Sequence, residues 1–488
     1  MSERPAAGRA IGSAVGWVSI SQVGRQLLQL AVTAVLARLL LPADFGLMSV
    51  TLVVIGILGL VRDLGTGVTI VQVPTLTTRL VSTLFWANVV LGIVAVVGVA
   101  ILSPAIAALF GEPRLQEIVT VSAFAFAISS LSIVQQALLE RAMRFRAVAS
   151  VELASVVVGG IVAVFAAFAG FGVWSLVAQS IAAAITSTVL YSLAGDWRPT
   201  RAFSAADLRS VGRFGLGVTG FNLFNYAARN ADYVLIGARL GPGPLGQYTL
   251  AYRVMLYPLQ AVSAVISRAT FPVYARLQAD DAGLRRLYLR AVSMIALIAF
   301  PMVFGVMATS DRLVAVLFGP NWTEAGQVLA ILAPVGLVQV IVMTVGPLYQ
   351  AKGRASLMLG WGAGSGVLTI VAFAIGLRWG ITGVAAAYLV VTIILAYPGL
   401  AVPYRLIGLT VPAMLRVIAR PAVCGAGMYA AVSIASRLSG QPVGSLVTFL
   451  ALVAAGAGVY LLLSLALNRA ALQELVRAAT TAAARSPA

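Results

Sequence analysis

Polar side chains recur at helical spacing within apolar stretches that are long enough to cross a bilayer. Gln22, Arg25 and Gln29 fall on one helical face in the first of these stretches. A later stretch repeats the spacing with Asn222, Asn225, Arg229 and Asp232. A third stretch contributes Arg253 and Tyr257. Because a guanidinium can donate two hydrogen bonds to one phosphate group, these positions predict a cavity that binds an anionic, phosphate-bearing molecule.

The cost of burying charge decides how the arginines are interpreted. An arginine at the bilayer centre costs about 2.5–3.5 kcal/mol on insertion scales, so it needs a wet cavity, a partner or a ligand. Arg25 and Arg253 have no acidic residue within their own apolar stretches, which favours a ligand. Arg229 and Asp232 stand three residues apart, and two readings stay open: a structural ion pair, or two residues of the site.

Asp232 is the one acidic residue that we place well inside an apolar stretch, so it is the candidate site for a coupling cation or proton. The chain has no histidine, which removes the commonest proton shuttle and metal ligand. We therefore expect no metal site and no cofactor. Coupling to a proton gradient, a sodium gradient or the membrane potential is the remaining source of energy.

The amino-acid composition indicates that the chain folds in a lipid bilayer. Of 488 residues, 60% are hydrophobic and 10% are charged, and the mean hydropathy is +0.99. A soluble domain carries roughly 25% charged residues, so this chain cannot cover a water-exposed surface. The sequence predicts an all-α integral membrane protein with about fourteen transmembrane helices, each of ~20 residues or more. We place these helices at 14–38, 44–62, 80–103, 116–139, 150–169, 173–193, 214–238, 244–268, 286–309, 324–349, 355–377, 380–402, 416–436 and 444–467.

The basic residues test this arrangement. With an even number of spans both termini share one side, and that side receives 24 of the 33 basic residues. The opposite side receives six: Arg38, Arg114, Arg239, Arg312, Arg378 and Arg437. A bias of this size indicates cytoplasmic termini. Lysine occurs only at Lys352 while arginine is abundant, which is typical of a high-GC bacterial genome, so we expect a bacterial inner membrane protein. The same bias also accounts for the formal charge of +18 without a nucleic-acid partner.

The chain repeats itself at an offset of about two hundred residues. Matching segments are Ala37–Leu39 with Ala238–Leu240, Phe45-Gly46 with Leu245-Gly246, Leu109–Gly111 with Leu317–Gly319, and Gly172 with Gly380. We infer two six-helix lobes that enter the membrane from the same side, followed by two further helices. Such lobes are related by an axis along the membrane normal, with a site between them near the midplane. The predicted boundaries are 1–200, 201–404 and 405–488.

Short motifs add a family resemblance that extends over essentially the whole chain. They are Ala37–Gly46 (ARLLLPADFG), Asp63–Gly65, Leu317–Trp322 (LFGPNW) and Gln350–Arg354 (QAKGR). In order and spacing the chain resembles Wzx-type polysaccharide flippases of the multidrug/oligosaccharidyl-lipid/polysaccharide exporter superfamily. The resemblance implies a V-shaped central cavity, alternating access and a substrate of oligosaccharide on undecaprenyl diphosphate. The lipid II flippase of that superfamily has cavity arginines on helices one and eight, where Arg25 and Arg253 fall here.

We therefore expect a transporter that flips a lipid-linked oligosaccharide for polysaccharide biosynthesis and is not an enzyme. Its expected partners are that substrate, membrane lipids and polysaccharide-assembly proteins such as a polymerase. The alternatives are a cation-coupled small-molecule antiporter of the same superfamily and a membrane enzyme acting on lipid-linked sugars. Arginine-rich polar stripes disfavour cationic cargo. The absence of an external loop longer than roughly twenty residues disfavours the enzyme.

Overall fold

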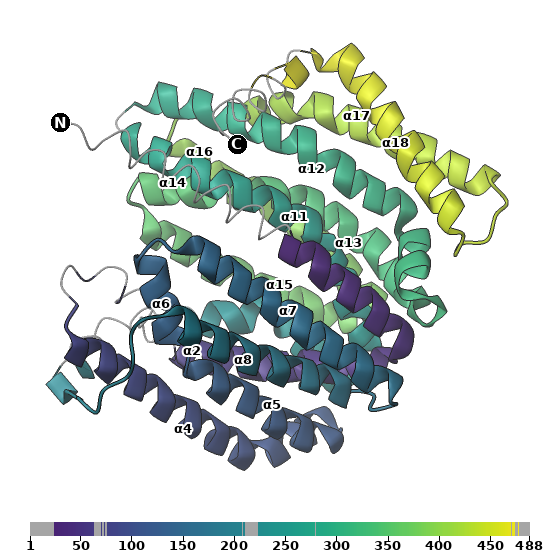
Figure 1. Cartoon of the computed structure of the whole chain (residues 1–488). Coiled ribbons are helices and arrows are strands. Elements are labelled where there is room, and N and C mark those ends of the chain that lie inside the picture. The colour runs from purple at the N-terminus through teal and green to yellow at the C-terminus, as the bar shows by residue number, and fades with distance from the viewer. Residues whose placement is uncertain are drawn as a thin grey trace. The chain divides into compact units, whose positions relative to one another are not determined.

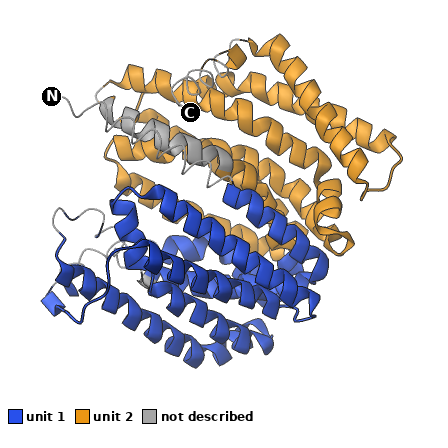
Figure 2. Ribbon diagram, in the orientation of Figure 1, with its two compact units in different colours: residues 1–246 blue, residues 247–488 orange. Residues whose placement is uncertain are grey.

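The computed structural model describes residues 24–62, 70, 73, 76–206, 208–209, 223–278, 280–469, 471–473 and 477. Within these residues every regular element is a helix and there is no strand (Figure 1). The chain divides into two compact units, Met1–Gly246 and Gln247–Ala488, which Figure 2 colours separately. The boundaries predicted near 200 and 404 stay predictions, because this division groups residues by packing and not by repeat.

Unit 1 contains the helices of the first half of the sequence. Residues 24–39, called here the N-terminal helix, and residues 223–229 are helical. Its other helices are α2 (Pro42–Arg62), α4 (Thr78–Phe110), α5 (Arg114–Ser130), α6 (Ile133–Arg141), α7 (Phe145–Phe168), α8 (Trp174–Ala194) and α10 (Ala231–Leu240). The helix α11 (Pro242–Arg276) begins in this unit and continues into the next.

Unit 2 contains the helices of the second half, which Figure 1 colours from teal to yellow. They are α12 (Asp281–Phe318), α13 (Thr323–Val342), α14 (Gly346–Ala351), α15 (Ala355–Gly376), α16 (Gly380–Arg405), α17 (Val411–Leu438) and α18 (Leu446–Leu467). Short 3-10 turns at Pro320–Trp322, Met343–Val345 and Leu377–Trp379 join some of them. The buried core of this unit centres on Tyr288, whose hydroxyl lies 2.6 Å from the Thr344 hydroxyl and 3.0 Å from the Tyr404 hydroxyl.

Ten segments of the described residues are long and apolar enough to cross a membrane. One of them, Ala355–Arg405, contains both α15 and α16 and matches two predicted spans. The predicted first and seventh helices extend beyond the described residues, and α11 is not among the ten. The all-helical, multi-pass membrane fold is confirmed, whereas the count of fourteen stays a prediction.

The repeat predicted from short sequence matches is visible in the backbone. Gly111 ends α4 with φ +62°, and its mate Gly319 ends α12 with φ +93°. Gly172 precedes α8 with φ +54°, and its mate Gly380 precedes α16 with φ +70°. Positive φ strains a residue with a side chain, so glycine is retained where each copy turns between helices.

One departure from the predicted helices occurs at the same place in both copies. The span predicted at 116–139 is interrupted between α5 and α6, and the span predicted at 324–349 is interrupted between α13 and α14. At the first interruption Ser129 and Ser130 donate to the carbonyl of Phe126, and Ser132 donates to the carbonyl of Ser129. Such local bonds compete with the helical ladder, so the apolar pattern alone did not predict the break.

Repeat mates also contact each other at the start of α2 and α11. A Cβ added to Gly46 would lie 2.6 Å from the carbonyl carbon of Pro242, and a Cβ added to Gly246 would lie 2.6 Å from that of Pro42. The glycine of each copy therefore contacts the proline at the equivalent helix start of the other copy. The same local contact is made twice at these two helix starts, while the axis that relates the two lobes stays a prediction.

The last two helices are fastened to α12 by a buried arginine. Arg312 is 7% exposed and donates five hydrogen bonds. Its acceptors, all at the end of α17 or in the turn before α18, are the hydroxyl and carbonyl oxygens of Ser436, the Ser439 hydroxyl and the carbonyls of Gln441 and Pro442. The sequence placed Arg312 in an external loop, but α12 continues beyond the predicted end at 309 and carries this side chain into the protein.

Candidate functional site

The predicted site residues are distributed over both units, and each unit is considered by itself. Gln22 and Asn222 lie outside the described residues. Unit 1 contains Arg25, Gln29, Asn225, Arg229 and Asp232, whereas unit 2 contains Arg253 and Tyr257. The cavity predicted between the lobes stays a prediction.

Arg25 lies where the N-terminal helix packs against α7. Its Nη1 atom is 3.6 Å from Oε2 of Glu152, and the two side chains are 32% and 33% exposed. Close packing fixes this position, since a Cβ on Gly160 of α7 would lie 2.6 Å from a methyl group of Val32. The ion pair is long and partly exposed to solvent, so it contributes little to stability. Gln29 is exposed one turn further along the N-terminal helix.

The second polar stripe has an exposed part and a buried part. Asn225 and Arg229 are exposed on the helix 223–229. Asn230 interrupts that helix, and Asp232 follows in the first turn of α10 with 2% exposure. Oδ1 of Asp232 accepts a hydrogen bond from the Tyr233 amide at 2.9 Å. No ion pair between Arg229 and Asp232 is seen among the described residues, and the two readings of this pair stay predictions.

In unit 2, α11 places a second guanidinium deep in the fold. Arg253 and Tyr257 are half-buried and one helical turn apart. Arg253 lies eleven residues from the start of α11, which corresponds to about 16 Å along the helix axis. Among the described residues it has no hydrogen-bond or ion-pair partner. A half-buried cation in a membrane protein requires water or an anion to stabilise it.

Beside Arg253 is a cluster of aromatic rings that sequence reasoning did not assemble. Tyr252 stacks on Tyr248 with ring centroids 6.1 Å apart and on Tyr388 with centroids 6.3 Å apart. The Tyr388 hydroxyl receives a hydrogen bond of 2.5 Å from Nε2 of Gln339. Tyr252, Tyr388 and Gln339 are all half-buried. Aromatic faces beside amide and hydroxyl groups provide both the apolar and the polar contacts that a sugar ring offers.

Glu152 is the other residue that the sequence analysis missed. It lies inside the apolar span Phe145–Phe168, so Asp232 is not the one acid within a membrane helix. A signal was available, since a carboxylate eight residues into an apolar helix is as costly as an arginine. Within the described part of the chain, His, Cys, Asp and Glu form no group of three that could hold a metal ion.

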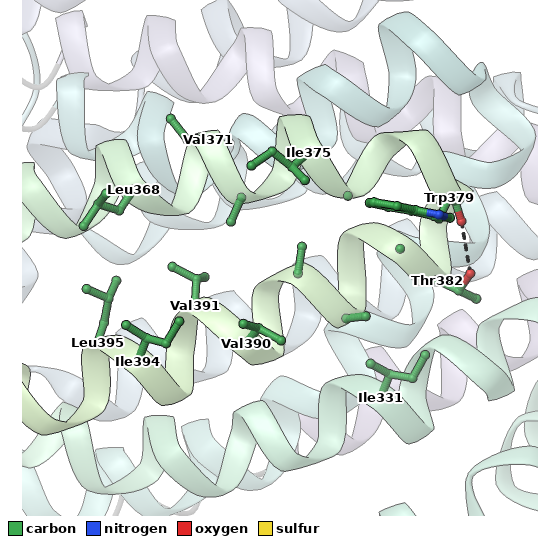
Figure 3. Close-up of a pocket in the computed structure, with 15 residues that line it drawn as sticks. Ile331, Leu368, Val371, Ile375, Trp379, Thr382, Val390, Val391, Ile394 and Leu395 are labelled. Atoms are coloured by element: carbon green, nitrogen blue, oxygen red, sulfur yellow. Dashed lines mark hydrogen bonds between the residues drawn. The ribbon is translucent and has the colours of Figure 1, made fainter.

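A large groove in unit 2 has the opposite character. It has a volume of about 780 Å³ and lies between α15 and α16, with Ile331 of α13 at one side (Figure 3). Its lining is almost entirely hydrocarbon, including Leu368, Val371, Ile375 and Ile394. Burying a charged group here would cost several kcal/mol, so the groove is suited to hydrocarbon chains and not to a phosphate.

Comparison with known proteins gives the context of these features. Residues 35–327 match the model of a family described as polysaccharide biosynthesis protein. Over 389 residues the chain is 30% identical to the lipopolysaccharide biosynthesis protein WzxC of Escherichia coli (strain K12), covering 78% of each chain. It is 27% identical to the teichuronic acid biosynthesis protein TuaB of Bacillus subtilis (strain 168), covering 74% of this chain and 75% of the relative. The structure of the lipid II flippase MurJ in an inward closed conformation superposes with a TM-score of 0.73 at 14% identity, covering 91% of this chain and 97% of that one.

Proposed function

Because the chain belongs to the polysaccharide biosynthesis protein family, we propose that it flips an oligosaccharide carried on undecaprenyl diphosphate. The direction is from the cytoplasmic leaflet to the outer leaflet of a bacterial inner membrane, with both chain termini in the cytoplasm. The chain acts as a transporter and not as an enzyme. Polysaccharide-assembly proteins such as a polymerase are its partners on the receiving side.

The observation that carries this proposal is the half-buried guanidinium of Arg253, which lacks a partner among the described residues. A diphosphate offers the planar, doubly accepting oxygens that a guanidinium recognises. Tyr252, Tyr388 and Gln339, which contact one another in the same unit, supply stacking faces and polar groups for the sugar. The same positive charge repels organic cations, which disfavours the antiporter alternative.

Transport then requires that the arginines bind the headgroup on the cytoplasmic side of the membrane and release it on the outer side. The diphosphate pairs with Arg25 and Arg253, and its negative charge offsets the cost of holding these cations in the membrane. The polyprenyl chain stays in hydrocarbon throughout, so only the polar headgroup moves through the protein. Rocking of the two lobes opens the site first to the cytoplasm and then outward.

Coupling to an ion gradient is assigned to Asp232. Its carboxylate is buried and lies in the first turn of α10. Binding of a proton or a sodium ion would neutralise the Asp232 carboxylate and change how the interruption between the helix 223–229 and α10 is stabilised. Such a neutralisation provides a simple link between an ion gradient and a helix movement.

The proposal is tested by flipping of a fluorescent diphosphate-linked oligosaccharide in vesicles that contain the purified protein. Arg253→Ala should lower the rate at least about tenfold, because charge-assisted hydrogen bonds are worth about 1.5–3 kcal/mol each. Arg25→Ala should also lower it, whereas Glu152→Gln, which releases Arg25 from its partner, should preserve it. Arg378→Ala removes an exposed arginine from the turn between α15 and α16 and serves as the matched control. A folded Arg253→Ala protein that flips at the control rate would refute the proposal.

A further inference from the structure

A second polar site lies in unit 1, and none of the residues that line it belongs to the site described above. A pocket of about 350 Å³ is enclosed by the first turn of α4, the helix α6 and the residues that follow α8. Gln135, Arg144 and Trp197 are among its lining residues. Three membrane helices begin or end around it, so the pocket opens at the level of the lipid headgroups.

Two buried groups in this pocket lack the hydrogen bonds that burial demands. Gln135 is 5% exposed, and its side-chain oxygen has no partner in the described part of the chain. The indole Nε1 of Trp197 is buried and is likewise without an acceptor among the described residues. Leaving such groups unsatisfied costs about 1–3 kcal/mol each, so native proteins retain them where something else binds.

The rim of the pocket carries two charged side chains, Arg144 and Asp196. Nη1 of Arg144 is 3.5 Å from Oδ2 of Asp196, but these side chains are 48% and 101% exposed, so the pair is worth little and leaves the guanidinium available. The N-terminus of α4, a helix of 33 residues, also reaches the pocket, and its first turn contains no acidic residue. A helix N-terminus and an arginine together favour an anion, in particular a phosphate.

We propose that this pocket binds the headgroup of an anionic glycerophospholipid, with its phosphate at Arg144 and the N-terminus of α4. The glycerol hydroxyl groups of the headgroup donate to Gln135 and accept from Trp197. Both the phosphate and the hydroxyl groups are needed. A phosphate alone would pair with Arg144 but leave Gln135 and Trp197 without hydrogen bonds, and an uncharged alcohol would do the reverse. The hydrocarbon chains of such a lipid stay in the bilayer beside the pocket.

The test uses the full-length protein in a neutral detergent, with thermal unfolding followed as lipid is added. Phosphatidylglycerol should raise the melting temperature, whereas phosphatidylcholine and free glycerol 3-phosphate should not. Gln135→Leu removes one unpartnered group at similar volume, and Trp197→Phe removes the other while retaining an aromatic ring beside Phe85. Each should weaken the response to phosphatidylglycerol threefold to tenfold in lipid concentration.

The same variants distinguish a binding site from a merely structural pocket. Without lipid, Gln135→Leu should unfold at the same temperature as the parent or higher, because it removes a buried unsatisfied group at similar volume. Arg144→Ala should abolish most of the response, while Arg146→Ala, an exposed neighbour that does not line the pocket, should retain it. Parent-like responses in all three pocket variants would overturn the proposal. A response to glycerol 3-phosphate equal to that of the lipid would overturn the assignment to a membrane lipid.

Discussion

Substituting Gly46 by alanine should separate α2 from the first turn of α11. The added Cβ would overlap the carbonyl oxygen of Pro242 and lie 2.6 Å from its carbonyl carbon, against 3.4–4 Å for an ordinary contact. Backbone atoms cannot rotate away as a flexible side chain can. The two helix starts must therefore part by roughly 1 Å.

The magnitude follows from the nature of this contact. Overpacking by one methyl group in a tight interior costs about 1–3 kcal/mol, and each 1.4 kcal/mol changes an equilibrium constant tenfold. If the helix starts separate during transport, Gly46→Ala shifts the balance toward the separated form by roughly fivefold to more than a hundredfold. Because the contact is reciprocal, Gly246→Ala should have the same effect, and the double variant should add little.

The separation can be measured between two spin labels. Leu41 and Arg239 are exposed residues that flank the contact within unit 1, and cysteines at these positions can be labelled once the single native cysteine, Cys424, is replaced. Distances are then recorded in lipid nanodiscs. The parent should give one short distance, and Gly46→Ala should give a longer one or a mixture of the two.

The control is Gly98→Ala in α4, where an added Cβ meets nothing within 4 Å. It makes the same chemical change in a membrane helix without touching a neighbour. If Gly46→Ala and Gly98→Ala give the same distances as the parent, the helix starts are not in contact in the membrane. The reasoning from the reciprocal glycines would then be refuted.

Two further substitutions probe the packing of unit 2. Arg312→Ala should lower the free energy of unfolding by about 3–5 kcal/mol, because five buried acceptors lose their donor. Thermal unfolding measures this effect, with Arg437→Ala, an exposed neighbour of those acceptors, as the control. Equal melting temperatures of the two variants would contradict the prediction. Gly383→Ala should destabilise by about 1–3 kcal/mol, because its Cβ would overlap the Gly376 carbonyl oxygen where α15 and α16 cross. Gly364→Ala is the control, because its added Cβ meets nothing within 4 Å; it should leave stability unchanged or raise it by up to about 1 kcal/mol. Equal melting temperatures for Gly383→Ala and Gly364→Ala would contradict a close contact between α15 and α16.

The sequence predicted those parts of the fold that depend on local pattern. Apolar runs predicted the helices, and glycines such as Gly111 and Gly319 predicted the turns. Both predictions are possible because the length of a helix and the backbone geometry of a turn depend on a short segment of sequence. The short matches around Gly46 and Gly246 also predicted the repeat, since each copy retains the residues that its own turns and close contacts require.

The sequence did not predict which side chains meet across helices. Glu152 approaches Arg25 from a helix 127 positions later in the chain, and no spacing rule reports a pairing of that kind. Arg312 was predicted only as a basic residue of an external loop, whereas its acceptors lie 124 to 130 residues away. For the same reason the stacking of Tyr252 on Tyr388 was not predicted.

The anchoring of α17 and α18 by Arg312 has a practical implication for anyone who attaches a reporter to this protein. Since the appended pair is tied to α12 through its own turn, a fluorophore or antibody tag placed in the turn at 439–445 will follow the movements of the second half of the chain. A matching reporter for the first half has to be placed elsewhere, for instance in the turn between α4 and α5. Such a pair of reporters would record the transport cycle without altering any residue that meets the cargo.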